Sequence, residues 1–169
     1  MSHLSQVSLV DTLLVRDARG HYLPATAEQI LAAAREAVDR KMQRGAKFGM
    51  PDEVKAYLCA KLGGLEHEVF AVLFLDNRHR LIEYVEMFRG TLDGASVHPR
   101  EVLKEALRWN AAAVILAHPH PSGSPEPSAA DRAITRQIKE ALMLIEVRTL
   151  DHIVVGGNTT VSFAERGLL

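Results

Sequence analysis

The sequence predicts an α/β sandwich with a mixed central sheet, and three observations lead to this prediction. Segments with helical periodicity alternate along the chain with short apolar segments of strand length. Of the 169 residues, 47% are hydrophobic and 24% are charged, which is the composition of an average soluble globular protein. A chain of this length buries roughly 70% of its extended surface when it folds, which is enough for a core without covalent staples.

Two helices are predicted before the first long apolar segment. Thr26 and Gln29 form a capping signal, and the apolar residues that follow recur at helical spacing, which predicts a helix over residues 27–44. Pro51 opens a second predicted helix over residues 52–62, where a pair of glycines ends it.

The remaining chain alternates between strands and helices. The continuous apolar run over residues 69–75 is typical of a buried strand, and a polar turn separates it from its hairpin partner. We expect an N-terminal extension over residues 1–50, mainly one helix with a flexible start, and a domain over residues 51–169. The other predicted elements of that domain are a strand over 81–88, a loop over 90–97, a helix over 100–109, a strand over 111–117, a helix over 128–143 and strands over 147–155 and 159–163.

Charge and cysteine content exclude several classes of protein. Lys and Arg number 20 and Asp and Glu number 21, so the chain lacks the basic excess of a dedicated nucleic-acid-binding protein. The single cysteine, Cys59, can form neither a disulfide framework nor a Cys-rich zinc site. No apolar run approaches the roughly 20 residues that span a bilayer, so we expect a cytoplasmic protein that does not bind membranes.

A pair of histidines follows the predicted strand over residues 111–117. His118 and His120 are two residues apart, so in extended backbone both imidazoles point to the same side. Further along, Ser128 and Asp131 lie one helical turn apart at the predicted start of a helix. Two imidazole nitrogens, one carboxylate oxygen and a vacant position for water are the ligands of a catalytic zinc site.

Each of these features also has a simpler explanation. Ser128 and Asp131 would form a good helix capping box, and a histidine pair can occur at a strand end by chance. The prolines between the two pairs favour the metal site, because proline fixes φ and holds the ends of the segment in one relation. Four of the seven prolines of the chain lie there, at positions 119, 121, 125 and 127.

The pattern His118-x-His120-x7-Ser128-x2-Asp131 resembles the signature of JAMM (MPN-plus) metalloproteases. The stretch AHPHPSGSPEPSAAD and its flanking segments resemble the RadC family, long labelled DNA repair proteins, and the resemblance covers residues 65–169. It implies a deaminase-like (JAB/MPN) α/β sandwich in which Zn²⁺ is held by both histidines, Asp131 and a water.

The resemblance also implies catalytic roles. In JAMM proteins a glutamate at the start of the first core strand is the general base, a position that Glu68 matches and for which Glu66 and Glu83 are competitors. Ser128 corresponds to the serine that steadies the tetrahedral intermediate. The implied activity is zinc-dependent hydrolysis of peptide or isopeptide bonds in an unidentified protein or peptide substrate.

An alternative is a non-catalytic, metal-binding module associated with DNA repair or DNA–protein complexes. Net charge argues against DNA binding, and the helix-hairpin-helix segment of longer RadC proteins has no counterpart in this sequence. Pro119 also replaces the asparagine that is usual between the two histidines in RadC proteins. The remaining histidines of the domain and its extension are expected to be structural or solvated, namely His21, His67, His79, His98 and His152.

Overall fold

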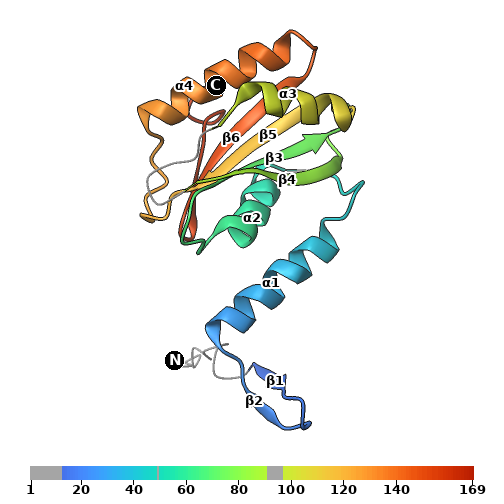
Figure 1. Cartoon of the computed structure of the whole chain (residues 1–169), viewed down its shortest axis with the longest axis vertical. Coiled ribbons are helices and arrows are strands. Elements are labelled where there is room, and N and C mark those ends of the chain that lie inside the picture. Colours follow the sequence, from blue (N-terminus) through green and yellow to red (C-terminus); the bar gives the residue numbers. More distant parts are fainter. Residues whose placement is uncertain (1–12, 49, 91–96) are drawn as a thin grey trace, which may run out of the picture. The chain divides into compact units, whose positions relative to one another are not determined.

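The computed structural model describes residues 13–48, 50–90 and 97–169, and these divide into two compact units between residues 40 and 41 (Figure 1). Most of the predicted loop over residues 90–97 lies outside the described residues, as does the start of the chain. The predicted domain boundary at residue 50 stays a prediction. Within the described residues, none of the helices has the length and apolar character needed to cross a membrane.

The first unit contains a hairpin that the sequence analysis did not predict. Strands β1 (Leu14–Arg16) and β2 (Tyr22–Pro24) pair antiparallel, and Asp17 holds the turn by accepting hydrogen bonds from two backbone N–H groups. Each strand has three residues, too few for an alternating pattern to stand out. Helix α1 (Ala27–Lys41) begins at the predicted cap but ends three residues before the predicted residue 44.

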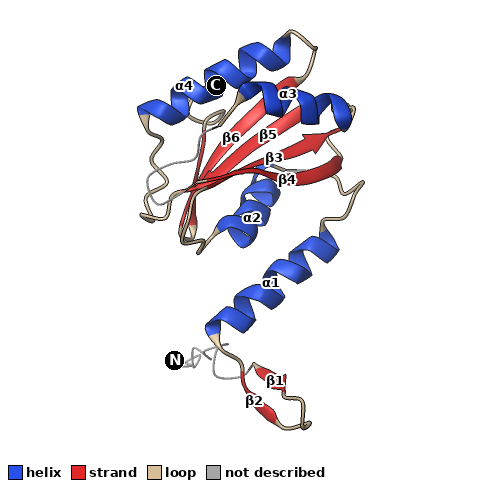
Figure 2. Ribbon diagram, in the orientation of Figure 1, coloured by secondary structure: helices blue, strands red, loops and turns tan. Residues whose placement is uncertain are grey.

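The second unit is a mixed α/β sandwich, as predicted (Figure 2). Its five-stranded sheet has the order β4-β3-β5-β6-β7, in which only the β5–β6 pair is parallel. The strands are β3 (Val69–Leu75), β4 (Leu81–Arg89), β5 (Ala113–Pro119), β6 (Arg148–Gly156) and β7 (Thr159–Ser162).

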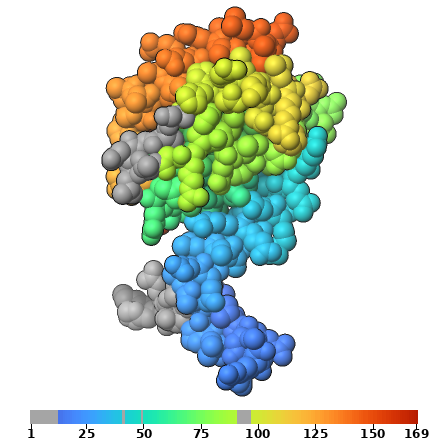
Figure 3. Space-filling view, in the orientation of Figure 1, coloured from blue at the N-terminus to red at the C-terminus, as the bar shows by residue number. Residues whose placement is uncertain are grey.

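Helices cover both faces of this sheet. Helix α2 (Pro51–Leu62) packs on one face against β5, β6 and β7. Helices α3 (Pro99–Arg108) and α4 (Ala129–Met143) lie side by side over the other face and form one continuous surface there (Figure 3). Beneath them is an apolar core of alternate residues from β3 and β5 and the inner residues of both helices, including Phe70, Val72, Phe74, Val114, Leu116, Val102, Ala106, Ile138 and Leu142.

The parallel β5–β6 pair contains one irregularity. Val114 is paired with Thr149, but the next residue, Ile115, is paired with Asp151. Leu150 is therefore an extra residue in β6, and every residue after it is displaced by one relative to β5.

Substitution of a core residue of α4 tests how this helix is docked. Ile138 is fully buried, so Ile138→Ala should lower the free energy of unfolding by about 2–5 kcal/mol, measured by urea denaturation. Leu144→Ala is the control, because Leu144 is 84% exposed at the end of the same helix and should change stability by less than about 0.5 kcal/mol. Equal losses in both variants would contradict the observed packing of α4.

Candidate metal centre

The two predicted histidines come from the carboxyl end of β5, at the centre of the sheet. This strand continues to Pro119, whereas the predicted strand ended at residue 117, so His118 lies within the sheet. The backbone N–H of His120 donates to the Val155 carbonyl at 2.7 Å, which keeps the chain extended for one residue more. Both rings consequently face the same side, with their centroids 4.8 Å apart.

A cavity lies beside these rings, at the point where the pairing between β3 and β5 ends. The antiparallel register ends at Ala71 and Ala117, so the residues beyond that pair lie opposite one another without a hydrogen-bonded ladder. Continuing the register places Phe70 opposite His118, and their rings stack with centroids 6.3 Å apart. The same count places Glu68 opposite His120. Because β3 leaves this stretch of β5 unpaired, a cavity of about 430 Å³ forms there.

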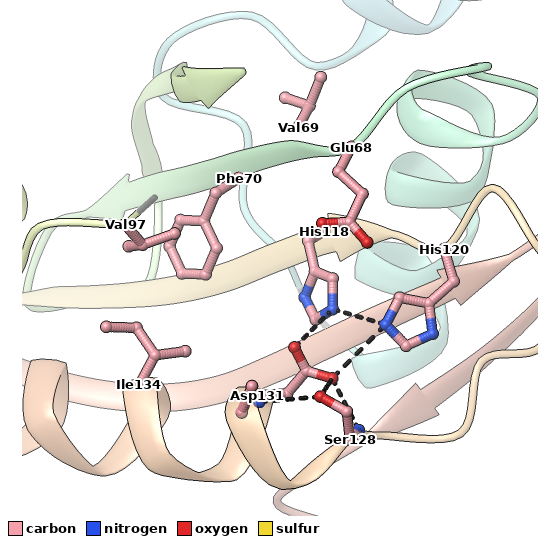
Figure 4. A pocket seen from close by; sticks show the side chains of 10 residues that line it. Glu68, Val69, Phe70, Val97, His118, His120, Ser128, Asp131 and Ile134 are labelled. Carbon is pink, nitrogen blue, oxygen red and sulfur yellow. Dashed lines mark hydrogen bonds and ion pairs between the residues drawn. The ribbon is translucent and has the colours of Figure 1, made fainter. Parts of the chain in front are cut away.

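Asp131 enters the cavity from the first turn of α4. Ser128 is the N-cap of this helix, and its hydroxyl accepts a hydrogen bond from the Asp131 N–H at 3.1 Å. In return Asp131 Oδ2 accepts hydrogen bonds from the Ser128 N–H at 2.7 Å and from its hydroxyl at 2.6 Å. The capping box that the sequence suggested as an alternative is therefore present, and it directs the same carboxylate towards the histidines (Figure 4).

The ligand atoms of His118, His120 and Asp131 lie close enough together to share one metal ion. His118 Nε2 lies 3.0 Å from His120 Nε2 and 3.2 Å from Asp131 Oδ1, and His120 Nε2 lies 3.5 Å from Asp131 Oδ2. Metal–ligand bonds of about 2.0–2.1 Å in a tetrahedral zinc site separate neighbouring ligand atoms by roughly 3.3 Å. These three side chains are therefore a group that could hold a metal ion.

His120 already presents the nitrogen that such a site needs. Its Nδ1 lies 2.8 Å from the backbone carbonyl oxygen of Ser124, which can only accept a hydrogen bond. The proton of a neutral His120 is consequently on Nδ1, and the lone pair of Nε2 points into the cavity. Histidine ligands of metal ions usually donate their other N–H to a carbonyl or carboxylate in this way.

The environment of Asp131 keeps its carboxylate ionised. Burial raises the pKa of this carboxyl, but the interaction with His118, in the state where that imidazole carries a proton on Nε2, and the hydrogen bonds from Ser128 outweigh burial and hold the pKa well below its usual range. An ionised carboxylate beside two imidazoles favours a cation at the point they share.

Of the three candidate glutamates, Glu68 alone is on the wall of the cavity. Its carboxylate points towards the histidine pair (Figure 4). Glu66 is exposed and Glu83, on β4, accepts a hydrogen bond from the backbone N–H of Tyr84. The other end of the cavity is apolar and is formed by Phe70, Val97 and Ile134.

Two buried residues lie behind the site, and the sequence did not indicate their contacts with it. His152 was expected to be structural or solvated; its side chain is completely buried, as a structural residue would be, and its Nε2 lies 2.9 Å from His118 Nδ1. Thr135, on α4, was not singled out, and its hydroxyl lies 2.5 Å from His152 Nδ1. A polar residue at 152 followed by the apolar run Ile-Val-Val was the one available signal for His152.

The loop over residues 120–127, which contains three prolines, lies directly against β6 at Gly156. A Cβ atom on Gly156 would lie 2.5 Å from Pro125 N and 2.6 Å from the Gly123 carbonyl oxygen, so only glycine fits at this position. The loop that rests on Gly156 carries the Ser124 carbonyl that holds the His120 ring.

Comparison with known proteins identifies a family. Residues 48–168 match the family model described as the RadC-like JAB domain. The chain is 60% identical over 141 residues to a UPF0758 protein of Vibrio cholerae, covering 83% of this chain and 89% of that protein. It is 58% identical over 139 residues to a UPF0758 protein of Nitrosococcus oceani, covering 82% of this chain and 62% of the relative.

The coverage differs among these relatives. A UPF0758 protein of Halorhodospira halophila is 50% identical over 159 residues, which are 94% of this chain and 71% of the relative. The chain spans less than two thirds of the Nitrosococcus protein.

Gly156→Ala should weaken metal binding although it changes none of the three candidate ligands. The added methyl group forces the loop away from β6, so the Ser124 carbonyl loses its position beside His120 and the affinity for Zn²⁺ should fall by roughly tenfold or more. Titration of the metal-free protein with Zn²⁺ against a competing chelator measures this change. Gly157→Asn is the matched control: the site has open space and a φ of +58°, which asparagine tolerates, so affinity should stay at the wild-type value.

Proposed function

The chain belongs to the family of RadC-like JAB domains, and we propose that its cavity is the active site of a zinc-dependent hydrolase that cleaves peptide or isopeptide bonds. One observation carries this proposal. His118 Nε2 and His120 Nε2 lie 3.0 Å apart, and each lies within 3.5 Å of a different oxygen of the Asp131 carboxylate, in a cavity that Glu68 also lines.

The donor set suits zinc. Two imidazole nitrogens and one carboxylate oxygen are ligands of catalytic zinc sites, which keep one position open, whereas structural sites use four protein ligands. A zinc ion held by these residues would act as a Lewis acid and lower the pKa of water at the open position to about 7.

Glu68 and Ser128 would supply the remaining chemistry. A carboxylate on the wall of the cavity can accept the proton of the attacking water and return it to the nitrogen of the leaving amine. The Ser128 hydroxyl, which donates to Asp131 Oδ2 at 2.6 Å, is close enough to the ligands to turn towards an oxyanion developing on the carbonyl oxygen. The apolar wall formed by Phe70, Val97 and Ile134 would lower the local dielectric and strengthen both interactions.

Asp131→Asn separates the metal role from the capping role. Asparagine can keep much of the capping geometry with Ser128 but removes the anionic ligand. The variant should lose zinc, measured by elemental analysis, while the metal-free protein changes in stability by about 1 kcal/mol or less. Unchanged zinc content in this variant, with His120→Ala analysed beside it, would reduce Asp131 to a capping residue.

Glu68→Gln tests whether the protein is an enzyme. The zinc-loaded protein is incubated with a diverse library of peptides and isopeptide-linked peptides, and cleavage is followed by mass spectrometry. Glu68→Gln should retain zinc and lower turnover by roughly 10²–10⁴-fold, because a positioned general base is worth about that factor.

Glu66→Gln is the control for Glu68→Gln, because Glu66 is exposed and outside the cavity, and its turnover should match the wild type. If the wild-type protein binds zinc but cleaves nothing beyond the Glu68→Gln background, the alternative of a non-catalytic metal-binding module takes the place of this proposal.

A further inference from the structure

A chain of three hydrogen bonds runs behind the candidate metal centre and joins two of its ligands. His118 Nδ1 lies 2.9 Å from His152 Nε2, and His152 Nδ1 lies 2.5 Å from Thr135 Oγ1. The Thr135 hydroxyl in turn donates to the backbone carbonyl oxygen of Asp131 at 2.5 Å. The three side chains in this chain are buried: His118 is 5% exposed, Thr135 2% and His152 0%.

The direction of every bond in this chain follows from its last acceptor. A backbone carbonyl can only accept, so the single proton of the Thr135 hydroxyl is donated to Asp131. The Thr135 oxygen can then only accept from His152, which places a proton on His152 Nδ1. A neutral His152 therefore has a bare Nε2, which accepts from His118 Nδ1. The remaining nitrogen of a neutral His118, Nε2, is left without a proton and faces the cavity.

We propose that Thr135 and His152 are positioning residues that hold His118 in the tautomer whose Nε2 lone pair faces the metal. This inference rests on the proposed metal centre. It assigns a role to a buried histidine that is not itself a ligand, and it makes α4 control both the carboxylate ligand and the tautomer of the buried histidine ligand.

The surroundings of His152 fit this role. Its ring is packed between Phe70 and Phe163, with centroids 5.6 Å and 4.7 Å away, so the ring is held in one orientation. Both ring nitrogens of His152 lie within hydrogen-bond distance of a partner, His118 Nδ1 on one side and the Thr135 hydroxyl on the other. A neutral imidazole that both accepts and donates is the state that the hydrogen bonds require.

The irregularity in β6 brings His152 to this position. With the extra residue Leu150, His152 is paired with Leu116, whose side chain is in the core beneath α3 and α4. If the register of Val114 and Thr149 continued without the bulge, Asp151 would be paired with Leu116 instead, and a carboxylate cannot both donate and accept. Bulges beside functional sites commonly redirect a side chain in this way.

Loss of these three hydrogen bonds would allow His118 to adopt the other tautomer. A buried N–H at Nδ1 without an acceptor is costly, whereas a proton on Nε2 could be donated to Asp131 Oδ1, 3.2 Å away. A proton at Nε2 competes directly with a metal ion for the same lone pair.

A pair of substitutions at Thr135 tests the proposal. Thr135→Val keeps the volume of the side chain and removes the hydroxyl, so the affinity for Zn²⁺, measured by titration against a chelator, should fall by about 10–100-fold. Thr135→Ser keeps the hydroxyl and should restore wild-type affinity. His152→Phe retains the ring between Phe70 and Phe163 but removes the acceptor, and it should weaken zinc binding as Thr135→Val does.

A metal-free measurement separates this proposal from the proposed function. Two-bond ¹H–¹⁵N NMR spectra of the imidazoles report tautomers directly, and they are recorded on the metal-free protein at about pH 9, above the ordinary histidine pKa of about 6.5. We expect Nδ1–H for both His118 and His152 in the wild type, and a shift of His118 towards Nε2–H in Thr135→Val.

The outcomes are distinct. If the wild type shows the expected tautomers but binds no zinc, the proposed function fails while the tautomer assignment stands. If His118 carries its proton on Nε2 in the wild type, or if Thr135→Val changes neither its tautomer nor zinc affinity, the positioning role is overturned.

Discussion

The site depends on the point at which β3 and β5 stop pairing. Up to Ala71 and Ala117 the two strands form a regular antiparallel ladder, and beyond that pair they diverge. This leaves the last residues of β5 without a hydrogen-bonded partner on one side. Pro119 has no N–H to donate, so it is tolerated there without the loss of a hydrogen bond between strands. It also brings the start of β3 across from the histidine pair, so Glu68 reaches a cavity whose other polar groups come from residues at least 50 positions later in the chain.

Helix α4 combines structural and chemical roles at its amino end. The hydrogen bonds that cap the helix also orient the Asp131 carboxylate, so the stability of the first turn and the geometry of the candidate ligand cannot be optimised separately. One turn later, the Thr135 hydroxyl bonds back to the Asp131 carbonyl, an arrangement that usually weakens a helix slightly. Here the same hydroxyl is also the acceptor that orients a buried histidine.

The sequence predicted the features that local patterns encode and missed those that depend on register. The apolar run of β3 and the periodicity of α4 were sufficient to locate both elements, and the spacing of His118, His120 and Asp131, taken with the prolines between them, predicted the group that could hold a metal ion. Residue spacing could not show which glutamate faces them, because that depends on how β3 aligns with a strand more than 40 residues away. The contact between His152 and His118 could not be predicted for a similar reason: the register shift in β6 decides which side chain turns inward.

The crossover from β5 through α4 to β6 also has a kinetic consequence. His118 and Asp131 lie on different elements and become neighbours only after α4 packs on the sheet beside a long-range parallel strand pair. Such pairings form slowly, because the chain between them must close before the contacts stabilise it. A metal ion bound by both residues would therefore do little to accelerate folding. It would instead lower the rate of unfolding and so lengthen the lifetime of the folded protein.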